Sequence, residues 1–246
     1  MSVWVIADLH LSFGKDVPKP MDRFGSRWEN HAEKIARRWN AVVRPGDTVV
    51  MPGDFSWADT LSEAEADFRF LDALPGKKLL GKGNHDYWWT GVTKMKAFLA
   101  ERGFLTVDFL YNNAHAAEGL ALAGARGWFL EERQQTAIEA DYGKLVRREA
   151  ERLNLSLEAA EELRRKEGIG EPPLVFLHFP PVWGGFPARR ACRPDARPRR
   201  DPVLVRPHPR PVQPAALLRM EGDHLRQRRR GLPELHPAAR EDMSEE

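Results

Sequence analysis

This 246-residue chain has little cysteine and no long apolar run, and these scarcities exclude several classes of protein before any motif is considered. Its single cysteine, Cys192, excludes an intrachain disulfide framework and a zinc site built from several thiolates. No apolar run approaches the roughly 18 residues that a membrane helix needs. The N-terminal residues also lack the basic segment and following apolar stretch of a secretory signal. We therefore expect a cytoplasmic protein that makes no use of a membrane.

Lysine, isoleucine and aromatic residues are all absent from residues 187–246. The same segment holds half of the arginines and 10 of the 19 prolines of the chain. Proline is excluded from helix interiors and central strands, and large apolar side chains supply most of the free energy of burial. We therefore predict a folded domain over residues 1–186 and an arginine- and proline-rich, disordered tail over residues 187–246.

Residues 1–186 alternate between short apolar runs and amphipathic helical patterns. The apolar runs predict strands over residues 3–7, 48–51, 78–80, 105–110, 120–123 and 173–177. The helical spacing of apolar residues predicts helices over residues 29–43, 61–74, 92–101 and most of 133–168. Strands that alternate with helices are typical of a layered α/β domain.

Polar residues follow four of these expected strands, at the point where each strand ends. They are Asp8-Leu9-His10, Gly53-Asp54, Gly83-Asn84-His85-Asp86 and His178. Because strand ends in an α/β sheet point to one crevice, four separate segments deliver polar groups to one place. Carboxylate, amide and imidazole groups together suit ions such as manganese, iron or zinc. Taken singly, Asp8 or Asp54 is an ordinary turn residue, and His178 could be a buried structural histidine.

These ordered motifs resemble those of the calcineurin-like metallophosphoesterase superfamily over about residues 1–186. The longer runs at residues 8–12, 28–31, 53–58 and 83–89 are similar to a group of bacterial predicted phosphohydrolases of unassigned substrate. The resemblance implies a layered α/β fold, with a β-sheet core or sandwich flanked by helices. It also implies hydrolysis of phosphate mono- or diesters of small molecules by a hydroxide that two divalent ions, Mn, Fe or Zn, activate.

Carried over by position, the resemblance implies five metal ligands. Asp8 and His10 would bind the first ion. Asn84 and His178 would bind the second ion. Asp54 would bridge both ions, because a carboxylate has two oxygen atoms to share.

The resemblance implies further roles beside the ligands. His85 would act as general acid to the leaving oxygen or stabilise the charge of the phosphoryl group. Asp86 would orient the His85 ring. Arg126, whose planar guanidinium matches a phosphate, is expected to contact the substrate.

One expected motif is missing. The family has a Gly-His-x-His segment about 30 residues after the strand-ending histidine, which would supply two more ligands. Residues 205–211 offer only His208 there, between two prolines. We hypothesise that the chain after about residue 186 is read out of frame, since a one-base shift of a compatible coding sequence gives Tyr-Gly-His-Ile-His-Gly. Sequencing the coding DNA tests this, and the hypothesis fails if no single-base change restores the motif.

Two other interpretations stay open at this point. The chain could be an inactive or weakly active relative, because it lacks the Gly-His-x-His ligands. Alternatively, the basic tail could bind nucleic acid through Arg226 and residues 228–230, although it has no aromatic residue for base stacking.

Overall fold

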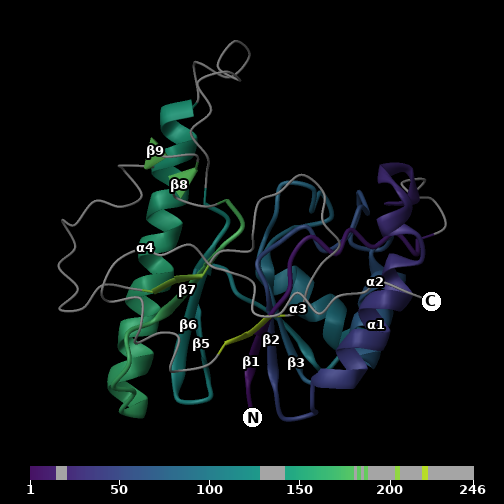
Figure 1. Cartoon of the computed structure of the whole chain (residues 1–246). Helices are drawn as coiled ribbons and strands as arrows, with labels where there is room; N and C mark the ends of the chain where they lie inside the picture. The colour runs from purple at the N-terminus through teal and green to yellow at the C-terminus, as the bar shows by residue number, and fades with distance from the viewer. Residues whose placement is uncertain are drawn as a thin grey trace.

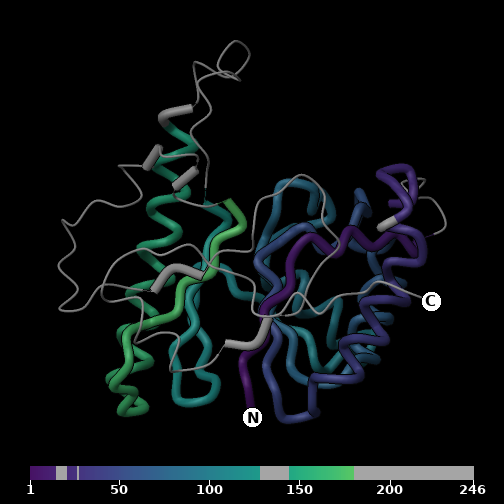
Figure 2. Tube along the Cα trace, viewed as in Figure 1, coloured from purple at the N-terminus to yellow at the C-terminus, as the bar shows by residue number. Residues whose placement is uncertain are grey.

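The computed structural model describes residues 1–14, 21–127 and 142–179 together with four short strands beyond them (Figure 2). Those four strands are β8 (Val182–Trp183), β9 (Phe186–Pro187), β10 (Val203–Val205) and β11 (Leu218–Met220).

The first sheet has five strands in the order β11-β1-β2-β3-β4. Beside β11 it contains β1 (Val3–Val5), β2 (Thr48–Met51), β3 (Lys77–Leu80) and β4 (Val107–Phe109). Strands β1 to β4 run parallel, and β11 pairs antiparallel with β1. Their carboxyl ends therefore lie along one edge of this sheet.

The second sheet has four strands in the order β10-β7-β6-β5. Beside β10 it contains β5 (Ala114–Ala117), β6 (Leu120–Ala125) and β7 (Leu174–Leu177). Strand β7 is parallel to both β6 and β10, whereas β5 and β6 form an antiparallel hairpin. The short strands β8 and β9 pair with each other.

Four α-helices and two short 3-10 helices complete the described elements. They are η1 (Met21–Phe24), η2 (Ser26–Trp28), α1 (His31–Val42), α2 (Glu65–Ala73), α3 (Val92–Glu101) and α4 (Tyr142–Glu167). Helices α1, α2 and α3 lie on one side of the molecule and α4 on the other, with both sheets between them (Figure 1).

Alternate residues of each strand show how these four layers pack. In β2, Val49 belongs to the apolar cluster shared with helices α1 to α3, whereas Val50 belongs to the cluster between the sheets. In β7, Phe176 joins that central cluster, whereas Val175 packs in the cluster that includes Leu153 of α4. Because side chains alternate across a strand, both faces of each sheet are buried. The expected α/β sandwich flanked by helices is thereby confirmed.

Most of the predicted elements are present, with ends that differ by a few residues. The strand at Thr48–Met51 and the helix at Val92–Glu101 agree with their predicted bounds. Helix α2 begins at Glu65 rather than residue 61, because residues 59–64 form bends and turns. In the tail, β10 and β11 are both edge strands, the position in a sheet that proline-rich sequence tolerates.

The part of the chain that the structure describes contains no helix long and apolar enough to cross a membrane.

Candidate metal centre

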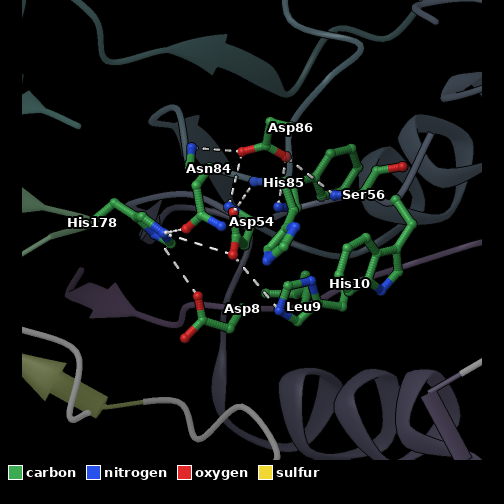
Figure 3. A network of polar contacts seen from close by, with 12 residues as sticks. Asp8, Leu9, His10, Asp54, Ser56, Asn84, His85, Asp86 and His178 are labelled. Carbon is green, nitrogen blue, oxygen red and sulfur yellow. Dashed lines mark hydrogen bonds and ion pairs between the residues drawn. The ribbon is translucent and has the colours of Figure 1, made fainter. Parts of the chain in front are cut away.

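The candidate residues follow the carboxyl ends of strands from both sheets. Asp8 lies three residues after β1, and Asp54 lies three residues after β2. Asn84 follows β3 after a short loop, and His178 comes directly after β7 of the second sheet. Figure 3 shows these side chains pointing toward one another, with Asp54 in the middle. The strand ends of two different sheets thus meet at this place.

Backbone hydrogen bonds hold the loops after β1 and β2 side by side. The Asp8 amide donates to the Gly53 carbonyl at 3.3 Å, and the His10 amide donates to the Asp54 carbonyl at 3.0 Å. Asp8, His10 and Asp54 all have a left-handed backbone, with φ of 57°, 48° and 55°. Residues other than glycine rarely adopt this conformation, and such strain gathers at functional sites.

The Oδ2 atom of Asp54 lies between two histidines. It is 3.7 Å from Nε2 of His10 and 3.6 Å from Nε2 of His178. The same Nε2 of His178 is 2.8 Å from Oδ1 of Asn84, and its Nδ1 is 3.8 Å from Oδ1 of Asp8. Asp8, His10 and Asp54 each offer a ligand atom within 4.8 Å of the others. The structure therefore brings all five predicted ligands together.

Burial shifts the protonation of the carboxylates and imidazoles in this centre. It raises the pKa of both Asp8 and Asp54 to about 6. Burial, with the nearby histidines His85 and His178, lowers the pKa of His10 to about 3. Burial also lowers the pKa of His178. Closely packed carboxylates and neutral imidazoles are the groups that a divalent cation would stabilise.

A second observation indicates that the residues fit a metal ion. The Nδ1 atom of His10 is buried and has no hydrogen-bond partner among the described residues. Buried polar atoms are normally paired, so an unpaired imidazole nitrogen is compatible with a ligand role. The oxygen and nitrogen donors of the centre are those that Mn, Fe and Zn accept.

The buried carboxylate of Asp86 holds the loops of the centre together. Its Oδ2 accepts the amides of Asp54 at 2.9 Å and Gly83 at 2.7 Å. Its Oδ1 accepts the amides of Phe55 at 2.9 Å and Ser56 at 3.3 Å, and the Trp88 indole also donates to it. The expected orientation of the His85 ring by Asp86 stays a prediction. A carboxylate with so many donors has a structural role in the loops.

The indole ring of Trp57 contacts two histidines at the centre, His10 and His85. The indole of Trp57 stacks on the His10 ring at 4.6 Å and an interplanar angle of 18°. It also lies 4.4 Å from the His85 ring, and the His85 amide donates to Oδ1 of Asp54 at 2.9 Å. Trp57 belongs to the run at residues 53–58, and its place three residues after Asp54 was the signal that could have assigned it to this centre.

Arg126 follows β6 and lies beside the loop after β7. Its carbonyl accepts the amide of Phe179 at 2.8 Å, so its backbone is adjacent to His178. Its guanidinium is 3.5 Å from Oε1 of Glu149, a helix α4 residue that is 2% exposed. The ion pair with Glu149 was not expected from the sequence, and the predicted contact of Arg126 with substrate stays a prediction.

Three sequence predictions fall outside the described residues. His208 lies there, so the structure does not test the missing Gly-His-x-His ligands or the reading-frame hypothesis. The cysteine at Cys192 and the arginine group around Arg226 also lie there.

Comparison with known proteins identifies the class of this chain. A family model described as calcineurin-like phosphoesterase matches residues 1–209, and the chain belongs to that family. The match ends beyond the predicted domain boundary at residue 186. Members of this family are metallophosphoesterases, so membership supports metal-dependent hydrolysis of phosphoesters as the class of reaction.

One curated protein matches part of this chain. The gene 66 protein of Mycobacterium phage L5 is 32% identical over 85 residues, which are 35% of this chain and 40% of that protein. The match thus spans about 40% of the length of this curated relative.

Two solved structures are also similar. A protein of unknown function from Aquifex aeolicus has 19% identity and a TM-score of 0.39, over 83% of this chain and 88% of its own. The phosphopantetheinyl hydrolase of Mycobacterium tuberculosis has 16% identity and a TM-score of 0.40, over 78% of this chain and 70% of its own.

Proposed function

We propose that this chain hydrolyses phosphate mono- or diesters of small molecules and that it uses two divalent cations. The observation that carries the proposal is the position of the Asp54 carboxylate, whose Oδ2 lies 3.7 Å from His10 and 3.6 Å from His178. A carboxylate that lies between two imidazoles is in the position expected of a ligand that bridges two cations. The family match gives the class of reaction to which this arrangement belongs.

The ligands divide into two groups that share Asp54. Asp8 and His10 would hold one cation, and Asn84 and His178 would hold the other. When bound, such a pair of ions polarises phosphoryl oxygens and lowers the pKa of a water molecule. The contact between Nε2 of His178 and Oδ1 of Asn84, at 2.8 Å, keeps the second pair of donors together.

The remaining residues of the centre position groups and move a proton. His85 is held at its backbone by the bond to Asp54, and Trp57 contacts its ring. We assign His85 the transfer of a proton to the leaving oxygen, or the stabilisation of phosphoryl charge. Asp86 keeps the amides of the loops after β2 and β3 in register.

Hydrolysis of p-nitrophenyl phosphate and bis-p-nitrophenyl phosphate tests the proposal. We expect release of p-nitrophenolate in buffer with Mn²⁺. Treatment with EDTA should abolish this release, because it removes the cations that would polarise the phosphoryl oxygens and activate water. Metal analysis of the purified chain should give a divalent ion. If this chain is inert and a frame-restored chain is active, the alternative of an inactive relative is correct.

His85→Ala should lower turnover of p-nitrophenyl phosphate by about a hundredfold, the contribution typical of a general acid. Because His85 is not assigned as a ligand, metal content should stay close to that of the parent. His115→Ala is the matched control, since that ring binds the Phe109 carbonyl and lies outside the centre. A parallel loss of metal in His85→Ala would make His85 a ligand instead.

A further inference from the structure

The run at residues 28–31 contacts the candidate metal centre from the start of helix α1. His31, the last residue of this run, is the first residue of that helix. Its Nε2 atom lies 3.1 Å from the carbonyl oxygen of Leu9. A carbonyl oxygen can only accept a hydrogen bond, so Nε2 of His31 carries a proton and donates it. His31 therefore binds the backbone of the residue that separates the predicted ligands Asp8 and His10.

The backbone that carries these two ligands needs support from its surroundings. Asp8 and His10 both have a left-handed backbone, with φ of 57° and 48°. Such a conformation is unfavourable for residues other than glycine and persists only where neighbouring contacts hold it. The amides of Asp8 and His10 supply part of this support, because both donate to the loop after β2. The bond from His31 to the Leu9 carbonyl supplies another part.

The peptide group between Leu9 and His10 is held at both of its polar atoms. In a trans peptide the carbonyl and the amide point in opposite directions. The His10 amide donates to the Asp54 carbonyl at 3.0 Å, and the Leu9 carbonyl accepts from His31 at 3.1 Å. This peptide thus lies between His31 and the backbone of Asp54. Its orientation determines where the His10 ring lies relative to the carboxylate of Asp54.

Apolar packing keeps His31 and Leu9 in place relative to each other. Trp28 is 2% exposed, and its ring centroid lies 5.5 Å from that of His31 and 6.3 Å from that of His10. The Leu9 side chain is fully buried and belongs to the same apolar cluster as Ile35 of α1. Because protein interiors are close-packed, helix α1 presents His31 to the Leu9 carbonyl from a fixed position.

The contact of His31 lies on one side of the centre. It reaches the segment that carries Asp8 and His10, the residues that would hold the first cation. Asn84 and His178, which would hold the second cation, follow β3 and β7 and contact each other at 2.8 Å. A change at His31 is therefore expected to act on one cation and not on the other.

We propose that His31 is a positioning residue for the first cation. By donating to the Leu9 carbonyl, His31 fixes the peptide that carries His10, and it thereby raises the affinity of Asp8 and His10 for a divalent ion. Groups that orient metal ligands typically contribute about 10–100-fold to metal affinity. The inference rests on the proposed function, because it takes the division of the ligands into two groups from there.

Calorimetric titration of the full chain with Mn²⁺, in the absence of substrate, tests this role. His31→Ala should raise one of the two Mn²⁺ dissociation constants about tenfold or more and leave the other at its parental value. The affected constant should be the one that Asp8→Asn raises, and not the one that His178→Ala raises. His31→Gln should restore the parental constant, because its side-chain amide can donate in place of the imidazole. His115→Ala, which removes a ring bound to the Phe109 carbonyl outside the centre, is the matched control and should bind Mn²⁺ like the parent.

The outcomes separate the positioning role from the proposed function. Parental values of both constants in His31→Ala would overturn the positioning role and leave the proposed function intact. Weakening of both binding steps together, or no recovery in His31→Gln, would also overturn it, because both indicate a general structural role. A parent chain that binds no Mn²⁺ would overturn the metal centre and the positioning role together. Weakening of the first step alone, in a chain that hydrolyses no phosphoester, would uphold the positioning role and count against the proposed function.

Discussion

Asp54→Asn is expected to lower the phosphoesterase turnover of this chain roughly a thousandfold, equivalent to about 4 kcal/mol of transition-state stabilisation. The substitution removes the charge shared by the two groups of ligands and leaves the shape nearly unchanged. Asparagine tolerates the left-handed φ of 55° found at this position, and its amide oxygen can still accept the His85 amide. The measurements are kcat with p-nitrophenyl phosphate and the metal content of the variant.

Thermal unfolding separates this loss of function from a loss of fold. Burial raises the pKa of Asp54, so a neutral amide removes an unfavourable buried charge from the metal-free chain. The melting temperature of metal-free Asp54→Asn should therefore not fall below that of the parent. Asp22→Asn, an exposed aspartate outside the centre, serves as the matched control and should keep parental turnover. Equal rates for Asp54→Asn and the parent would remove Asp54 from its proposed role.

The main elements of the fold could be predicted because their physical signal is local. Helix α3 has Met95 and Leu99 four residues apart on its buried face, and strand β2 is a run of four buried residues. Such periods appear directly in the sequence. Strand β5 was missed because Ala-His-Ala-Ala has little strand propensity. A two-residue turn with positive φ at Glu118 and Gly119 forms its hairpin with β6, and glycine there was the available signal.

The site could be predicted only in part, for a similar reason. Polar residues at strand ends are visible in the sequence, and the parallel topology brings those ends together. The partners of Asp86 and Arg126 were not predictable, because both are set by contacts between distant segments. Asp86 binds backbone amides of the loop after β2, about 30 residues earlier, and Arg126 pairs with Glu149 of α4. Backbone amides have no sequence signature, since every residue but proline carries one.

Gly83→Ala should disrupt the packing between the loops after β2 and β3 and abolish the phosphoesterase activity. A Cβ at this position would lie 2.0 Å from Oδ1 and 2.3 Å from the backbone nitrogen of Asp54. A backbone atom cannot move away as the end of a flexible side chain could, and the Gly83 amide is also fixed by its bond to Asp86. We expect a loss of about 3 kcal/mol in the free energy of unfolding, the upper range for overpacking. Calorimetry should show a melting temperature lower by on the order of 10 °C.

Gly170→Ala is the control that shows whether close packing of the two loops causes the losses expected of Gly83→Ala. Among the described residues, no atom lies within 4 Å of a Cβ built at Gly170, so Gly170→Ala should leave both the melting temperature and turnover close to those of the parent. Gly53, on the other of the two loops, gives a second check. A Cβ at Gly53 would lie 2.5 Å from the Cα of Gly83. Gly53→Ala should therefore reproduce the loss seen with Gly83→Ala. If Gly83→Ala folds and turns over like Gly170→Ala, the two loops do not pack this closely, and Asp54 is not held where a bridging ligand must be.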